Sequence, residues 1–219
     1  MEKTEMEFPY QGKTLSAMYP FFGPANSKTL QEEIEREKYK ESTFPELVSF
    51  INHYFNSEES KAKEFRKIMR TKYFVVFTGV LFLPWKKEVC FIDHPSFDRG
   101  SVVDVDDLES RLRMNDVRSK ISLDNIETGS IPWDKIAKNP LVIALSGGEE
   151  GAEKLAEIAS WHPDKKGHIF VPDVSNFSSP QARIPLLYSY GNGRSLTVSL
   201  NGSGYSINSY TVGLDKSKS

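Results

Sequence analysis

The sequence predicts an α+β fold, in which N-terminal helices pack on a mixed sheet that contains a β-α-β unit, followed by a C-terminal antiparallel meander. Helical apolar periodicity in residues 43–72 predicts the helices, and strand-like runs in residues 73–93 predict the start of the sheet. A β-α-β pattern over 141–171 predicts the β-α-β unit, and three short strand-like runs within 183–214 predict the meander. We expect a helical part, 27–72, and a sheet-rich part, 73–214.

Domain organisation follows from the absence of a linker. The segments succeed one another without a flexible stretch, which favours a single compact domain over 1–219. Two subdomains, 1–100 and 101–219, are the alternative.

Composition argues against several function classes. The chain has 219 residues, with 28 Lys+Arg against 30 Asp+Glu and a formal charge of -2, so no positive excess indicates nucleic acid or an anionic membrane. Its longest apolar run, 73–83, is far shorter than the roughly 20 residues of a membrane-spanning helix. The single cysteine, Cys90, has no internal partner for a disulfide, and residues 1–10 lack an apolar leader. We therefore expect a cytoplasmic protein with no nucleic-acid or membrane partner.

The first 72 residues predict an irregular arm and three helices. Prolines among aromatic residues in 1–26 indicate an arm held by its rings. Residues 27–40 form a mostly polar helical pattern. Thr43 and Glu46 have capping-box spacing at the start of a second, strongly apolar helix, and a third helix extends to Lys72.

The next segment predicts a β-hairpin. Residues 73–83 and 88–93 are β-branched and aromatic, and the four residues between them suit a turn. Both strands are apolar at nearly every position, so both faces should be covered. Cys90 lies inside this run and is expected to be an inert core thiol.

Residues 94–138 contain few regular signals. The acidic cluster 104–107 lacks the remaining oxygen ligands of a calcium loop, so we interpret it as a helix start favoured by the helix dipole. Residues 117–123 predict a short edge strand. Residues 124–138 predict a loop with one helical turn after Pro132.

The β-α-β pattern consists of an apolar strand at 141–145, a helix, and a second strand ending at Val171. Its strands should be parallel, with a right-handed crossover. Three further strands, 183–190, 195–200 and 205–214, should form the meander, with one buried face and one wet face.

The turn between the first strand and the helix is the candidate ligand-binding site, and it comprises Ser146, Gly147, Gly148, Glu149 and Glu150. A helix N-terminus attracts anions, but the two glutamates would repel a phosphate and already complement the dipole. Ser146 and Glu149 also have capping-box spacing. The turn is therefore either a structural cap or an acidic rim for a cation.

No complete catalytic or cofactor motif is present, so we assign no catalytic residue, metal ligand or cofactor. The four histidines lie in separate contexts, without the i,i+4 pairing of a zinc helix. A mixed oxygen and nitrogen metal site remains an alternative if the fold brings together side chains at element ends. Its members would be Asp93, His94, Glu149, His162 and Asp173.

The leading functional hypothesis is a non-catalytic intracellular protein that acts through a protein partner or through self-association. It depends on the missing motifs and on aromatic residues expected at the surface, such as Phe21, Phe22 and Trp85. The alternative is a small-ligand-binding or metal-dependent enzyme with its site at the 146–151 turn.

Overall fold

The computed structural model describes residues 3–98, 102–124 and 126–217. It confirms the α+β class. The helices are α1 (Ser27–Arg36), α2 (Phe44–Tyr54), α3 (Ser60–Thr71), α4 (Val105–Arg113), α5 (Trp133–Ile136), α6 (Pro140–Leu145) and α7 (Glu149–Ser160), with 3-10 turns η1 (Pro84–Lys86) and η2 (Val174–Asn176). The strands are β1 (Thr4–Tyr10), β2 (Lys13–Tyr19), β3 (Phe22–Ala25), β4 (Tyr39–Glu41), β5 (Tyr73–Val75), β6 (Thr78–Leu83), β7 (Glu88–Asp93), β8 (Ser119–Ser122), β9 (Gly129–Pro132), β10 (Lys166–Phe170), β11 (Gln181–Tyr190), β12 (Ser195–Gly202), β13 (Ser209–Thr211) and β14 (Gly213–Asp215).

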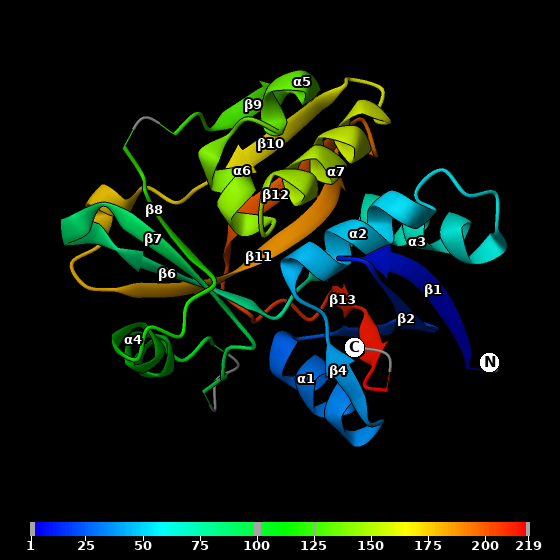
Figure 1. Cartoon of the computed structure of the whole chain (residues 1–219), viewed down its shortest axis with the longest axis horizontal. Helices are drawn as coiled ribbons and strands as arrows, with labels where there is room; N and C mark the ends of the chain where they lie inside the picture. The colour runs from blue at the N-terminus through cyan, green and yellow to red at the C-terminus, as the bar shows by residue number, and fades with distance from the viewer. Residues whose placement is uncertain (1–2, 99–101, 125, 218–219) are drawn as a thin grey trace.

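The described strands form two sheets. The smaller has the order β1-β2-β14-β4, so it joins the two ends of the chain. The larger has the order β3-β13-β5-β11-β12-β10-β9, and β11 also pairs with β6, which continues through β7 to β8. Strands from the first and second halves of the sequence are therefore neighbours in both sheets (Figure 1). The assignment of one domain or two stays a prediction.

The N-terminal arm was predicted to be irregular, and this was wrong. β1 and β2 form an antiparallel hairpin, with Phe8 opposite Leu15. Its two-residue turn, Gln11 and Gly12, has φ values of 47° and 76°, and a type I′ turn requires positive φ at both positions. Met6 and Phe8 alternate inward to the core, which gives the strand period of two.

The two helices and the hairpin predicted for residues 43–93 are present, but the predicted strand 73–83 is divided into β5 and β6, and only β6 belongs to the hairpin. The carboxylate of Glu46 accepts hydrogen bonds from the N–H and the hydroxyl of Thr43, both at 2.7 Å, which closes the start of α2. β6 pairs antiparallel with β7, and both strands are buried along almost their whole length. Cys90 is fully buried, and burial raises the pKa of its thiol to about 11, as an inert core cysteine requires.

The β-α-β unit was wrong, although its helix and its second strand are present. Residues 140–145 form α6, because Asn139 caps the helix through hydrogen bonds from Leu141 N and Val142 N, and Pro140 occupies its first position. β10 pairs in parallel with β12 instead, and antiparallel with β9.

The C-terminal meander is correct for its first hairpin only. β11 and β12 are antiparallel neighbours, but β13 leaves them and pairs with β5 and β3. Two further local predictions are confirmed. Asp104 caps α4 through Asp106 N and Asp107 N, and β8 is the short edge strand.

The central part of the large sheet has two different faces. On one face, Phe74, Leu187, Val198 and Ile169 belong to the main core, together with apolar residues of α2 and α7. Figure 1 shows α6 and α7 lying over β10 and β12 on this side. On the opposite face, α4 packs over β6, β7 and β11, and α1 packs over β3 and β13. Leu30 of α1 and Leu108 of α4 belong to a second buried cluster there. No helix among the described residues has both the length and the apolar character needed for a membrane crossing.

Candidate functional site

The predicted ligand-binding turn connects two helices and does not follow a strand. Ser146 is the C-cap of α6, and Gly148, at φ 131°, is the N-cap of α7, so the expected capping box of Ser146 and Glu149 does not form. Gly147 has φ 77°, a left-handed conformation that favours glycine. Glu149 and Glu150 are exposed in the first turn of α7, and Glu150 accepts a hydrogen bond from Lys154 at 2.6 Å.

A small cavity of about 40 Å³ lies beneath this turn, between α2, α7 and the β1–β2 turn. Ser146 is 2% exposed, lines the cavity, and its hydroxyl has no hydrogen-bond partner among the described residues. Tyr10 lines it too, and burial, followed by the Glu46 carboxylate, raises the pKa of this phenol to about 12. The volume suits a water molecule and is far below that of a metabolite pocket.

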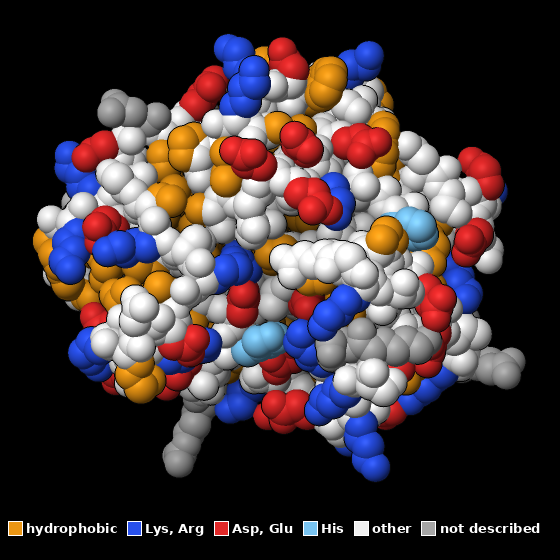
Figure 2. All heavy atoms as spheres, viewed as in Figure 1, with side chains coloured by type: hydrophobic (Ala, Val, Ile, Leu, Met, Phe, Trp, Pro, Cys, Tyr) orange, Lys and Arg blue, Asp and Glu red, His pale blue; other side chains and the backbone are white. Residues whose placement is uncertain are grey.

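The structure does not assemble the candidate metal ligands. Asp93 binds Arg118, His94 binds Glu41, and His162 lies in another part of the fold. Within the described ranges, no group of three His, Cys, Asp or Glu side chains is placed to hold a metal ion. Acidic side chains instead gather over α7, whose sequence contributes four glutamates (Figure 2).

The aromatic residues expected at the surface differ in their placement. Phe21 is 6% exposed, and its ring contacts Phe50, Phe65 and Phe74 edge to face, so it is a core residue. Phe22 is half-buried. Trp85 is 63% exposed, as expected.

A different aromatic surface lies on the sheet face turned away from α7. We call it the tyrosine face, and it consists of Tyr73, His168, Phe170, Tyr188 and Tyr190. Strand register explains why these side chains meet. Tyr188 is opposite Thr197, and Thr197 is opposite His168, so they form one row across three strands. Tyr73 extends the row on β5, where its ring is 5.0 Å from that of Tyr188.

The rest of the tyrosine face lies two residues further along the strands. Because side chains alternate, Tyr190 and Phe170 share the face of Tyr188 and His168. The His168 ring is 5.7 Å from Tyr190 and 6.2 Å from Phe170. Tyr190 is 57% exposed and Phe170 45%, so their rings stand in solvent.

The tyrosine face borders a shallow pocket of about 370 Å³ where α3 ends and β5 begins. Arg70 and Lys72 line this pocket together with Tyr73, Tyr188 and Tyr190. Burial, followed by the nearby Tyr73 and Tyr190, raises the pKa of Tyr188. The surface therefore presents tyrosine side chains beside two cations.

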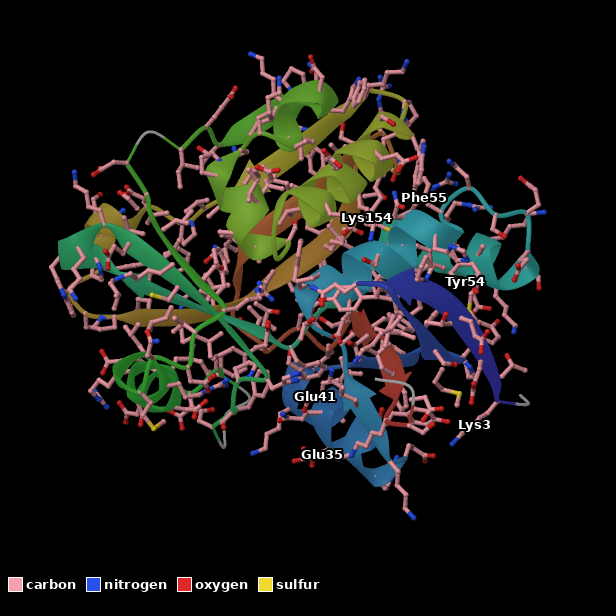
Figure 3. The ribbon with its side chains drawn as sticks, viewed as in Figure 1. Lys3, Glu35, Glu41, Tyr54, Phe55 and Lys154 are labelled. Carbon is pink, nitrogen blue, oxygen red and sulfur yellow. The ribbon has the colours of Figure 1, made fainter. Side chains whose placement is uncertain are left out.

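On the other side of Ser189, a second pocket of about 320 Å³ opens towards the C-terminal ends of α2 and α7. We call it the arginine pocket, and its main lining residues are Phe55, Arg66, Arg70, Trp161, His162 and Arg194. Figure 3 shows Phe55 at the end of α2, beside α7. His162 Nδ1 is 2.9 Å from the carbonyl of Ile158, and its Nε2 is 2.9 Å from the hydroxyl of Ser189. Burial lowers the pKa of His162, so the neutral ring donates to the carbonyl and accepts from the serine.

Comparisons with known proteins add to the fold description. No family model and no curated protein matches the chain. The chain is similar to a solved structure described by the words "Accommodation of massive sequence variation in Nanoarchaeota by the C-type lectin fold", with 17% identity, 97% coverage of both chains and a TM-score of 0.58. At this identity the likeness concerns the fold, and the chain has a C-type-lectin-like fold.

Sequence reasoning missed the tyrosine face and the arginine pocket. Residues 188–210 are rich in Tyr, Ser, Gly and Asn, a compositional signal that was available. Tyr73 and Arg70, however, lie far away in the sequence, and only the pairing of β5 with β11 brings them to this surface.

Proposed function

We propose that this protein is a non-catalytic binding protein that docks a protein partner on the tyrosine face. The observation that carries the proposal is the cluster of exposed aromatic side chains on a rigid sheet, bordered by Arg70 and Lys72. Tyrosine and arginine are enriched at protein interfaces. Tyrosine supplies a large contact area and a hydrogen bond at a low entropy cost, and arginine supplies several hydrogen-bond donors.

The shape of the tyrosine face favours a protein over a small molecule. Its aromatic row spans β5, β11, β12 and β10, and neighbouring strands are about 4.8 Å apart, so the row is about 14 Å wide. It is broad and open, whereas small-molecule sites enclose most of their ligand. A broad patch of this kind can form the centre of an interface of ordinary size.

The C-type-lectin-like fold supports the same proposal. The similar solved structure is described as an example of the accommodation of massive sequence variation by this fold. In the present chain, core residues and surface residues lie on opposite faces of the same strands. Leu187 and Val198 belong to the core, whereas Tyr188 and Tyr190 stand on the opposite face. The binding residues can therefore change without altering the core.

Site-specific cross-linking tests the proposal. A photo-reactive phenylalanine analogue is placed at position 190, on the tyrosine face, or at position 85, an exposed aromatic position on the β6–β7 turn. In lysate from the source cells, position 190 should capture a discrete protein that position 85 does not capture. In a direct binding assay with that protein, Tyr190→Ala should weaken binding at least about tenfold, the effect of an interface hot spot, and Trp85→Ala should leave it unchanged.

Self-association is an outcome of the same experiment. If the cross-linked species is a second copy of this chain, sedimentation velocity should show a dimer that Tyr190→Ala dissociates. Identical capture at both positions, or equal affinity of Tyr190→Ala and wild type, would refute docking on the tyrosine face.

The turn at 146–151 is a second candidate, favoured by one observation. The buried Ser146 hydroxyl faces a cavity without a protein partner, so a water-sized ligand or small cation would fit there. Thermal melts with a panel of small cations test it. Unchanged responses after Glu149→Ala and Glu150→Ala would remove this candidate.

A further inference from the structure

The arginine pocket differs from the tyrosine face in shape and in charge. It lies beyond Ser189, on the side of the sheet that α7 covers, and none of the described residues that line it is acidic. Its volume of about 320 Å³ lies within the range of small-molecule sites. A ligand in this pocket would not require the proposed protein partner.

Two of the three arginines are held in place by protein groups. Arg66 donates to the carbonyl oxygens of Phe55 and Ser57, the latter at 2.9 Å. Arg194 pairs with Asp164, which accepts from its Nη2 at 2.9 Å. Both guanidinium groups are thereby oriented at the rim of the pocket.

Arg70 is different, because its guanidinium has no hydrogen-bond or ion-pair partner within the described part of the chain. Its stem packs against the β11–β12 turn, where a Cβ added to Gly193 would lie 2.8 Å from Arg70 Nε. The positive charge of Arg70 is close enough to His162 to help keep that ring neutral. The pocket thus contains an uncompensated cation with five hydrogen-bond donors.

The remaining walls are aromatic or neutral. The rings of Phe55 and Trp161 stack, with centroids 5.4 Å apart and planes 22° apart. His162 lies at the bottom of the pocket, and its two ring nitrogens already bind the Ile158 carbonyl and the Ser189 hydroxyl. No group on the floor competes for the charge of Arg70.

We propose that the arginine pocket binds a small molecule in which a phosphate or carboxylate is attached to a flat ring. Arg70 binds the oxyanion, since a planar guanidinium matches both groups with two parallel hydrogen bonds. Arg66, whose partners are neutral carbonyl oxygens, adds positive potential at the rim. The ring of the ligand packs against the pair formed by Phe55 and Trp161.

Tryptophan fluorescence tests this proposal, because Trp161 lines the pocket. Trp85→Phe and Trp133→Phe, at two exposed positions, leave Trp161 as the reporter. The probes are phenyl phosphate, benzoate and inorganic phosphate, each at constant ionic strength set with sodium chloride. Phenyl phosphate or benzoate should produce a saturable change at a lower concentration than inorganic phosphate, which lacks the ring.

A matched pair of variants assigns the effect to Arg70. Arg70→Gln should raise the Kd of the better aromatic probe at least about tenfold, the effect of losing charge-assisted hydrogen bonds. Arg113→Gln removes another exposed charge, from α4, which contributes nothing to the pocket, and should leave the Kd unchanged.

A second measurement uses the wild-type protein and does not depend on the folding of a variant. The ring resonances of His162 should shift when the aromatic probe is added, whereas those of His94, which binds Glu41 elsewhere, should not. Absence of saturable binding by both aromatic probes, or equal affinity of Arg70→Gln and Arg113→Gln, overturns the proposal.

Discussion

Removal of Arg118 should destabilise the protein more than removal of any well-exposed arginine, because Arg118 joins two parts of the fold. Its Nη1 donates to Asp93 at 2.6 Å and its Nη2 donates to the carbonyl of Leu145 at 2.7 Å. Asp93 also accepts from the Thr78 hydroxyl, which in turn accepts from Phe44 N. The chain of contacts therefore connects the end of α6 with the start of α2 through the β6–β7 hairpin.

The expected loss of stability follows from the two hydrogen bonds that Arg118 donates and from the solvent exposure of the side chains. A hydrogen bond to a charged group contributes about 1.5–3 kcal/mol, so two would contribute about 3–6 kcal/mol if fully buried. The side chains of Arg118 and Asp93 are 18% and 25% exposed, so residual hydration reduces this sum. For Arg118→Met, which keeps much of the apolar stem, we expect a loss of about 2–4 kcal/mol in the free energy of unfolding.

Urea unfolding measures both the loss of stability and the share of it that comes from the contact between Arg118 and Asp93. The four proteins compared are wild type, Arg118→Met, Asp93→Asn and the double variant. The double-mutant cycle should give a coupling energy of about 1–2 kcal/mol between the two residues, since they share a hydrogen bond. Arg113→Met is the control, because Arg113 is 70% exposed and lies 3.9 Å from Glu109, and it should change stability by less than about 0.5 kcal/mol. If Arg118→Met is as stable as this control, the connecting role of Arg118 is refuted.

Three further predictions concern buried polar groups. Glu46→Ala should lower the free energy of unfolding by about 2–3 kcal/mol, because the N-cap bonds of Thr43 and the bond from Lys40 at 3.0 Å are lost, and equal urea midpoints would contradict this. His162 has a lowered pKa in the folded protein, so its contribution to stability is complete above the unfolded pKa of about 6.5 and decreases as the pH falls below it. Urea midpoints measured between pH 8 and pH 5 should therefore fall less in His162→Gln than in wild type, and parallel curves would count against this. Cys90 should not react with a thiol reagent at pH 8 until urea unfolds the protein, since burial raises its pKa to about 11, and rapid labelling of the folded chain would show that the thiol is accessible.

Sequence patterns identified elements whose signals lie within a few residues of one another. The capping box at Thr43 and Glu46 predicted the start of α2, and its apolar stripe predicted the buried face. Asp104 likewise marked the start of α4. These predictions succeeded because a cap is formed by residues three positions apart, whatever the rest of the chain does.

The same local reasoning failed where two signals competed. Residues 141–145 are apolar and of strand length, yet Asn139 and Pro140 form a helix start, and the cap decided the outcome. In the N-terminal segment the prolines suggested irregular structure, although Gln11 and Gly12 formed a turn between alternating residues. In both places the residues at the element boundary were more informative than the composition of its interior.

The two candidate sites depend on contacts that no local pattern contains. Tyr73 and Arg70 come from the junction of α3 and β5, whereas Tyr188 and Ser189 come from β11, and the pairing of Leu187 with Phe74 sets their register. A shift of one residue in that register would move Tyr188 from the open face to the helix-covered face and Ser189 away from His162. The tyrosine face and the hydrogen bond on the floor of the arginine pocket therefore depend on the same strand pairing, with alternate residues of β11 supplying one site on each side of the sheet.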